Sequence, residues 1–325
     1  MATLQIVHTP TLPPTEESCR FRNSKPGLFL IWELTRFCNL ACLHCCTDSS
    51  PEASTENDVP FDRAVSVVRE FPKLNIDQVL FSGGEPLLRK DLPALIQEID
   101  CSATRVHIAS NGMPITVGMA RKLKNAGIAS VAISLDGHNA ETHNAVRLHG
   151  LAFQKTLDGI RACVAEQVPV RVAGMITPSN IDFIEDFVRL LVSLGVRKTL
   201  LSPVVEEAGR ARENAHLSLP AQLIPKALEA VDRARRDHGD FIEIDHRLSE
   251  QTQIIPGCAA GTRFVFISPE GDVGGCSWLF KTDPKRFSLG NIKRESLDMC
   301  LGRNESVMKP LISLTSWCPI PYVRS

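Results

Sequence analysis

Apolar runs of strand length recur six times in the first two thirds of the chain, at residues 28–34, 78–81, 105–109, 130–135, 170–176 and 198–202. Between these runs, apolar residues return every three or four positions, which is the spacing of a helix with one buried face. Ile184, Phe187, Val188 and Leu191 form one such stripe. Strands and helices that alternate in this way indicate β/α units around a parallel sheet. We therefore predict an α/β fold built on a parallel sheet, with a domain boundary near residue 240.

The pattern changes after a helix that we expect from about Pro220 to His238. From Cys258 onward the chain reads as short strands and turns, with glycines close together at positions 271, 274 and 275. We predict a small α+β domain over residues 241–325. Residues 1–27 contain several prolines and no apolar period, so they are predicted to form an N-terminal arm.

The composition is that of an ordinary soluble protein. The 325 residues are 43% hydrophobic and 22% charged, and the net charge is -1. This balance argues against a polybasic surface for nucleic acid. No apolar run approaches the roughly 18 residues of a membrane span, and the first residues do not form an export signal. We expect a cytoplasmic protein that binds neither nucleic acid nor membrane.

Eleven cysteines are distributed unevenly along the chain. An odd count without an export signal argues against a disulfide framework and favours metal or cluster ligation for some of them. Four cysteines stand alone in the sequence, and we predict that they are small buried packing residues. These four are Cys19, Cys101, Cys163 and Cys300.

The densest group follows the first predicted strand, where Cys38, Cys42 and Cys45 form a CxxxCxxC motif. Three thiolates on one loop can hold three irons of a [4Fe-4S] cube and leave the fourth iron open for an exogenous ligand. The alternative is zinc, which in a structural site takes four protein ligands. Only His44 or Cys46 could add the fourth from this loop, so we favour the iron-sulfur cluster.

Polar motifs stand at the ends of the next three predicted strands. They are Ser82-Gly83-Gly84-Glu85-Pro86, Ser110-Asn111-Gly112 and Ser134-Leu135-Asp136-Gly137. Each motif alone is most simply a turn or a strand cap. In this order, and after the cysteine motif, they make the chain resemble the radical SAM enzymes over about residues 28–240. The resemblance implies that these residues form a partial (β/α)6 barrel, similar to a TIM barrel.

This resemblance implies a binding site for S-adenosylmethionine. The Gly83-Gly84 backbone and the Glu85 carboxylate would hold the amino group of the cofactor. The polar strand ends would contact its ribose and its methionine part. The residues implied in these contacts are Ser110, Asn111, Ser134 and Asp136.

Two further residues have a role in the resemblance and an alternative beside it. Arg147 is similar to an arginine that neutralises a carboxylate near the cofactor, and the alternative is a solvated arginine on a helix. His44 stands where relatives usually have an aromatic residue. Its imidazole could stack near the adenine, although it could also ligate metal or titrate.

The C-terminal part resembles a SPASM/Twitch extension, which binds auxiliary iron-sulfur clusters. The resemblance rests on Cys258, Gly271 and Cys276, with a strand-turn-strand between the cysteines. A further run of four close cysteines is missing, so we expect one auxiliary cluster. Cys318 looks like its third ligand. The fourth is open between Cys300, which could also be packed core, and an iron that faces substrate.

The resemblance implies the reaction class. A reductant such as flavodoxin or ferredoxin would reduce the cluster, and reductive cleavage of S-adenosylmethionine would give a 5′-deoxyadenosyl radical that abstracts a substrate hydrogen. One substrate class is a ribosomal peptide, modified in natural-product or peptide-cofactor biosynthesis. The other is a small sugar or nucleoside, which is dehydrogenated, epimerised or decarboxylated. The third alternative, a non-catalytic metal-binding module, does not account for the cofactor motifs.

Overall fold

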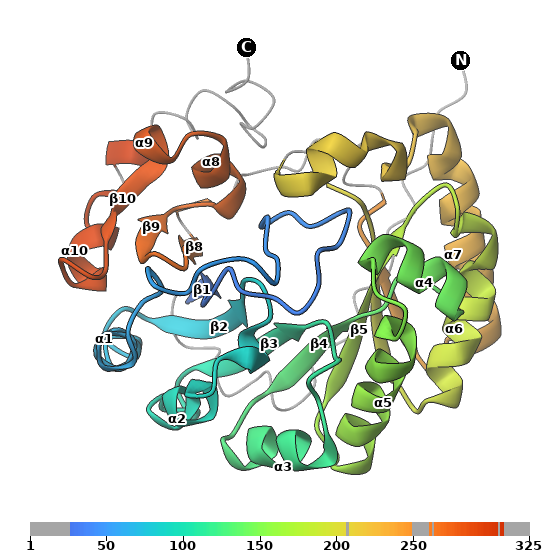
Figure 1. The fold of residues 1–325 in the computed structure, drawn as a ribbon, viewed down its shortest axis with the longest axis horizontal. Helices are drawn as coiled ribbons and strands as arrows, with labels where there is room; N and C mark the ends of the chain where they lie inside the picture. The colour runs from blue at the N-terminus through green and yellow to red at the C-terminus, as the bar shows by residue number, and fades with distance from the viewer. Residues whose placement is uncertain (1–26, 206–207, 249–259, 262, 305, 309–325) are drawn as a thin grey trace, which may run out of the picture.

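The computed structural model describes residues 27–205, 208–248, 260–261, 263–304 and 306–308 (Figure 1). The described strands form one ten-stranded sheet in the order β10-β9-β8-β1-β2-β3-β4-β5-β6-β7. From β1 to β7 the neighbours run parallel and in chain order. Their bounds are β1 (Leu28–Glu33), β2 (Ile76–Ser82), β3 (Arg105–Ser110), β4 (Ser130–Ser134), β5 (Val170–Ile176), β6 (Lys198–Pro203) and β7 (Glu243–His246). All six predicted strands are present, and the predicted α/β partial barrel is confirmed.

Helices follow the strands and cover the outer face of the curved sheet (Figure 1). They are α1 (Phe61–Val68), α2 (Leu92–Gln97), α3 (Val117–Asn125), α4 (Ala140–Arg147), α5 (Ala152–Ala165), α6 (Ile184–Ser193) and α7 (Ile224–His238). Short 3-10 segments connect them at η2 (Pro86–Leu88), η3 (Ile181–Phe183), η4 (Gly209–Leu217) and η5 (Ala221–Leu223). The predicted helix before residue 240 is therefore α7, preceded by η5.

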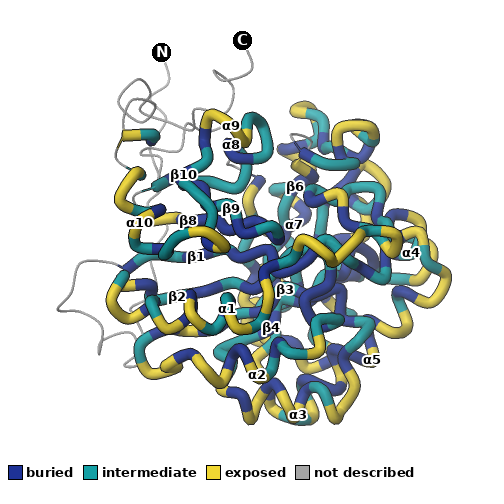
Figure 2. The backbone as a smooth tube through the Cα atoms, turned by 60° about the vertical axis from the view of Figure 1, so that its left-hand side comes forward, coloured by how far each residue is buried: buried dark blue, intermediate teal, exposed yellow. Residues whose placement is uncertain are grey.

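The core lies between the sheet and these helices. Alternate strand residues point toward the helices, and Val79, Val106, Val131 and Val172 are completely buried there. The stripe predicted on α6 is confirmed, because its four apolar side chains are all buried. Figure 2 shows the same arrangement, with buried strands at the centre and exposed outer faces on the helices. Among the helices that the structure describes, none is long and apolar enough to cross a membrane.

The C-terminal part continues the main sheet. The strands are β8 (Phe264–Ile267), β9 (Asp272–Gly274) and β10 (Ser288–Asn291), and the helices are α8 (Ser277–Thr282), α9 (Pro284–Phe287) and α10 (Leu297–Leu301). The predicted hairpin is present as β8 and β9, with Gly271 at a positive φ of 90° in its turn. Strand β8 pairs in parallel with β1, so this hairpin is joined to the barrel by backbone hydrogen bonds. The three proposed domain limits stay predictions.

The isolated cysteines differ in their surroundings. Cys163 and Cys300 are fully buried, as predicted. The prediction for Cys101 is wrong, because its side chain is exposed. It lies in a surface turn in which the Asp100 carboxylate accepts hydrogen bonds from the backbone and hydroxyl of Ser102. Cys19 lies outside the described residues.

Candidate functional site

The cysteine loop, which we define as residues 34–50, crosses the carboxyl ends of the strands between the C-terminal part and η4 (Figure 1). Cys38 and Cys42 are buried together, and Cys45 packs against them. The loop is closed by a backbone hydrogen bond from Cys38 N–H to Ser50. The structure thus gathers the three predicted ligands into one thiol cluster, Cys38, Cys42 and Cys45.

The two glycines after β2 pack directly on the backbone of this loop. Gly84 N–H donates to the Thr35 carbonyl at 2.7 Å, and Glu85 N–H donates to the Phe37 carbonyl at 2.9 Å. A Cβ on Gly84 would lie 2.2 Å from the Phe37 oxygen. Gly83 has a φ of +124°, and a Cβ there would lie 2.4 Å from the Thr35 oxygen. Both positions therefore require glycine for a contact within the protein.

The Glu85 carboxylate is completely buried behind these glycines. One oxygen accepts from Leu87 N–H at 3.1 Å, and the other accepts from Asn111 N–H at 2.7 Å. Burial raises the pKa of Glu85 to about 7, although both backbone hydrogen bonds favour the ionised form. Among the described residues, Glu85 has no ion-pair partner. A buried carboxylate of this kind is a suitable partner for an ammonium group.

The polar side chains at the end of β3 form hydrogen bonds within the protein. Asn111 Nδ2 donates to Asn39 at 2.7 Å and lies 3.8 Å from Cys38 Sγ. Its Oδ1 accepts from Met113 N–H, and Ser110 Oγ accepts from Gly112 N–H. These bonds fix the cysteine loop against β3. Cofactor contacts by Ser110 and Asn111, and by the partly exposed Ser134 at the end of β4, stay predictions.

Arg147, at the end of α4, is buried beside the cysteine loop. Its Nε and Nη2 both lie 2.7 Å from Asp136 Oδ2, and its Nη1 lies 3.7 Å from Cys42 Sγ. Only 8% of Arg147 is exposed, so the alternative of a solvated arginine is wrong. Burial by itself would raise the pKa of Asp136, but the Arg147 charge holds it at about 2. The arginine thus has a carboxylate partner within the protein.

His44 is a buried neighbour of this pair. Its Nε2 lies 3.4 Å from Asp136 Oδ2, and its buried Nδ1 has no hydrogen-bond partner among the described residues. Burial lowers the pKa of His44 to about 4, more than the Asp136 charge raises it. The imidazole is therefore neutral at physiological pH. A stacking role toward adenine stays a prediction.

Several residues that hold the cysteine loop were not found from the sequence. Arg210 in η4 donates from Nε to the Cys42 carbonyl at 3.0 Å and from Nη2 to the Ser49 carbonyl at 2.6 Å. Thr47 Oγ1 lies 3.2 Å from Cys45 Sγ and donates to the Gly83 carbonyl at 3.3 Å. No local motif marks either residue. For Arg210 the reason is that its contacts span more than 160 positions of the chain.

The C-terminal part contacts the loop at two points. Arg36 pairs with Glu270 in the hairpin turn at 2.6 Å. Lys281 in α8 lies 2.6 Å from Glu33 at the end of β1 and also donates to the Cys46 carbonyl at 3.4 Å. The Lys281–Glu33 pair is well buried, with 17% and 6% of the side chains exposed. These ion pairs fix the hairpin turn and α8 relative to the cysteine loop.

The proposed ligands of the second cluster are only partly visible. Cys276 is the residue that immediately precedes α8. Cys258 and Cys318 lie outside the described residues. Cys300 is packed into the main core, and burial raises the pKa of its thiol to about 12. This environment favours a packing role over ligation for Cys300.

The donors in the thiol cluster fit an iron-sulfur cluster. Cys38, Cys42 and Cys45 pack against one another, and their thiolates are the donors that such a cluster takes. Within the described ranges, no three His, Cys, Asp or Glu side chains converge on a single metal ion. A [4Fe-4S] cube does not require such convergence, because each thiolate binds a different iron.

A first prediction concerns the buried Arg147–Asp136 pair. Arg147→Met should lower the free energy of unfolding by about 3 to 5 kcal/mol, because it leaves the Asp136 carboxylate buried without its partner. The matched control is Arg121→Met, which removes an exposed pair with Glu166 and should cost far less. Urea unfolding of both variants measures the difference. Equal decreases in the free energy of unfolding would show that the buried pair stabilises the protein no more than the exposed one.

Comparison with known proteins agrees with this geometry. The chain matches the family model of the radical SAM superfamily over residues 32–215 and that of SPASM, an iron-sulfur cluster-binding domain, over residues 258–311. It is 27% identical to AdoMet-dependent heme synthase from Methanosarcina barkeri, over 77% of this chain and 76% of that protein. It is 26% identical to PqqA peptide cyclase from Xanthomonas euvesicatoria, over 90% of this chain and 78% of that protein.

A solved structure shares the fold. Streptococcus suis SuiB, crystallised with its precursor peptide SuiA, superposes with a TM-score of 0.67 at 14% identity. The match covers 85% of this chain and 64% of SuiB, so the chain spans less than two thirds of that protein. The predicted fold, the enzyme class and the cofactors agree with these matches. The chain belongs to the radical SAM superfamily and carries a SPASM domain, and it is an enzyme whose cofactors are a [4Fe-4S] cluster, S-adenosylmethionine and auxiliary iron-sulfur.

Proposed function

We propose that Cys38, Cys42 and Cys45 hold the catalytic [4Fe-4S] cluster and leave one iron for S-adenosylmethionine. The observation that carries this proposal is the thiol cluster on a loop that is hydrogen-bonded to the Gly83–Glu85 backbone. When bound, the cluster and S-adenosylmethionine supply a 5′-deoxyadenosyl radical that takes a hydrogen atom from the substrate. The remaining roles belong to side chains of this protein.

Glu85 would bind the cofactor ammonium, since it is a buried carboxylate without a cationic partner in the described part of the chain. Arg147 stabilises the thiolate form of Cys42 through the Nη1 contact. Asp136 holds the guanidinium in place for this contact. Cofactor binding by Ser134 and stacking by His44 are parts of the same proposal.

The second cluster would be held by Cys258, Cys276 and Cys318. Cys258 and Cys276 lie within the SPASM match, whereas Cys318 lies beyond it. Cys276 precedes α8, and the pairing of Lys281 in α8 with Glu33 at the end of β1 supports a position of this cluster near the cysteine loop. A reductant such as flavodoxin or ferredoxin would supply the electron that reduces the catalytic cluster.

For the substrate we propose a peptide, modified in natural-product or peptide-cofactor biosynthesis. The match to PqqA peptide cyclase over 90% of this chain supports this class. A second candidate is a tetrapyrrole, which the match to AdoMet-dependent heme synthase supports. A sugar or nucleoside substrate stays a prediction from the sequence.

Turnover assays separate the two supported classes. The anaerobically reconstituted enzyme is incubated with S-adenosylmethionine, dithionite and either iron coproporphyrin III or short peptides encoded beside its gene. We expect a peptide to increase the formation of 5′-deoxyadenosine, and we expect the amount of mass-shifted peptide to rise in proportion to it. Coupled conversion of the porphyrin instead would assign the tetrapyrrole class and overturn the peptide proposal.

Glu85→Gln should weaken binding of S-adenosylmethionine by about tenfold to a hundredfold, because it replaces a charge-assisted hydrogen bond. Iron content should not change. Since the pKa of Glu85 is about 7 in the free protein, the wild-type affinity should rise from about pH 6 to about pH 8 as the carboxylate ionises. The variant should lack this dependence. Calorimetry measures both effects, with the exposed Glu98→Gln as control; an unchanged affinity removes Glu85 from the site.

The joint variant Cys38→Ala, Cys42→Ala, Cys45→Ala should make no 5′-deoxyadenosine with dithionite and should lose about four irons. The neighbouring Cys46→Ala is the control, and it should still form 5′-deoxyadenosine and keep the full iron content. Adding Cys258→Ala and Cys276→Ala to the joint variant should remove most of the remaining iron. Cofactor cleavage by the joint variant would refute the ligand assignment, and retained iron after the last two changes would refute the auxiliary site.

A further inference from the structure

A large cavity lies at the amino-terminal end of the sheet, away from the cysteine loop. Its volume is about 630 Å3, which is within the range of small-molecule sites. It is lined by the first halves of β1 to β6 and by the loops that lead into β5 and β6. The cysteine loop follows the opposite, carboxyl end of β1. The cavity is therefore separate from the candidate cofactor site.

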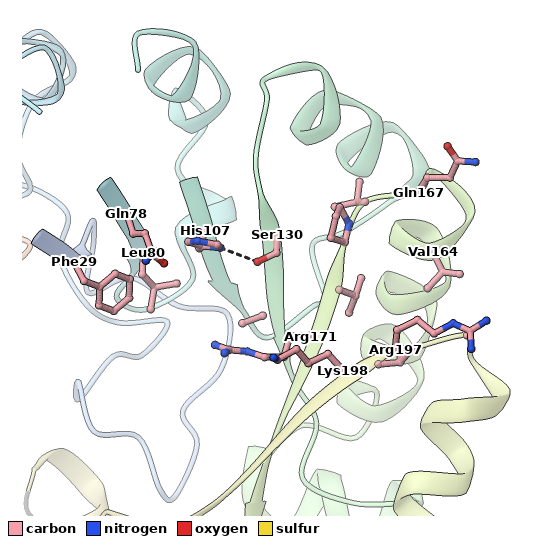
Figure 3. Close-up of a pocket in the computed structure, with 16 residues that line it drawn as sticks. Phe29, Gln78, Leu80, His107, Ser130, Val164, Gln167, Arg171, Arg197 and Lys198 are labelled. Atoms are coloured by element: carbon pink, nitrogen blue, oxygen red, sulfur yellow. Dashed lines mark hydrogen bonds between the residues drawn. The ribbon is translucent and has the colours of Figure 1, made fainter. Parts of the chain in front are cut away.

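The strand register places the lining side chains on the inner face of the barrel. Leu80 pairs with His107 and His107 with Ser130, so these three form one row across neighbouring strands. Ala132 pairs with Arg171 and Arg171 with Lys198, which form a second row. Barrel interiors are usually filled by bulky branched side chains. Here small, polar and basic residues leave the space open (Figure 3).

The lining is positively charged and contains no acidic residue among those described. Two of its three cations are already engaged. Lys198 pairs with Glu243 and Asp245, and Arg197 donates to the Phe241 carbonyl at the rim. Arg171 has no ion-pair or hydrogen-bond partner in the part of the chain that the structure describes. A half-buried guanidinium of this kind presents a fork of donors that matches a carboxylate or a phosphate.

Polar side chains near Arg171 also have unused hydrogen-bonding capacity. His107 Nδ1 lies 2.8 Å from Ser130 Oγ, while its buried Nε2 has no partner among the described residues. Burial lowers the pKa of His107 to about 4, so the ring is neutral at physiological pH. Gln78 also lines the cavity, and Figure 3 shows it on the side of His107 away from Ser130. Buried polar atoms without partners in a native protein call for a ligand or ordered water.

The rest of the wall is apolar. Phe29 and Leu80 contribute from β1 and β2, Val164 contributes from α5, and Val196 contributes from the loop before β6. These side chains suit the carbon body of a ligand whose charged end lies at Arg171. An inorganic anion alone would leave most of the volume unused.

We propose that this cavity is a second binding site, which takes an organic anion of metabolite size with its carboxylate or phosphate on Arg171 and its apolar body against Phe29 and Leu80. The site is formed by the barrel itself and requires neither S-adenosylmethionine nor an iron-sulfur cluster. It is therefore independent of the proposed catalytic function.

Calorimetry on the anaerobically reconstituted full chain tests this site with two probes, benzoate and phenyl phosphate. Benzamide, which has the same ring without the charge, is the neutral control. At least one anion should bind, and benzamide should bind at least about tenfold more weakly. The tighter of the two anions identifies the headgroup. Absence of binding by both anions, or equal binding of benzamide, would overturn the proposal.

Variants locate the bound probe. Arg171→Gln should weaken anion binding by about tenfold or more, whereas Arg161→Gln on the exposed face of α5 should leave it unchanged. Ala132→Leu keeps every charge but fills the cavity, so it should weaken binding as well and serves if Arg171→Gln does not fold. Unchanged affinity in the Arg171 and Ala132 variants would refute the site. Loss of binding in the joint variant of Cys38, Cys42 and Cys45 would show that the probe binds at the catalytic site, and this result would also refute the proposed cavity site.

Discussion

The functional end of this protein depends on backbone contact between the Gly83–Glu85 turn and the start of the cysteine loop. A loop with three thiols has no helix or sheet of its own to satisfy its carbonyl groups. Gly84 and Glu85 supply two of the missing donors, to Thr35 and Phe37. The approach is so close that any side chain at Gly84 would overlap with the Phe37 carbonyl. The position of the thiols relative to β2 is therefore set by main-chain geometry.

Charge balance around this loop follows from the same arrangement. Asp136 and Glu33 are buried with cationic partners, Arg147 and Lys281, while Glu85 is buried with hydrogen-bond donors from two backbone N–H groups and the Ser110 side chain. Two of these carboxylates are thus neutralised by the protein. The third has a raised pKa and no ion-pair partner among the described residues. This contrast supports the proposal that Glu85 binds the cofactor ammonium, and a cofactor contact by Asp136 stays a prediction.

Much of the fold could be predicted from the sequence, because its signals are local. The strands of the parallel sheet carry short apolar segments with buried residues at alternate positions, and the stripe on α6 shows directly which face is buried. The cysteine motif and the strand-end glycines could be recognised for the same reason. The clamp by Arg210 and the pairing of β8 with β1 could not, since both join segments that are distant in the chain. Cys101 shows a different limit, because residue type alone does not reveal on which side of a turn a side chain lies.

The parallel pairing of β8 with β1 has a mechanical consequence. A C-terminal domain on a flexible linker could swing, and the separation between two redox centres would then change from moment to moment. Here β8 shares hydrogen bonds with the strand that leads into the cysteine loop, and Lys281 ties α8 to the end of that same strand. Cys276 follows β9 and Cys38 follows β1, so both are attached to strands of one sheet. Electron tunnelling falls steeply with distance, so transfer between centres at these two positions would run at a constant rate without any gating by domain movement.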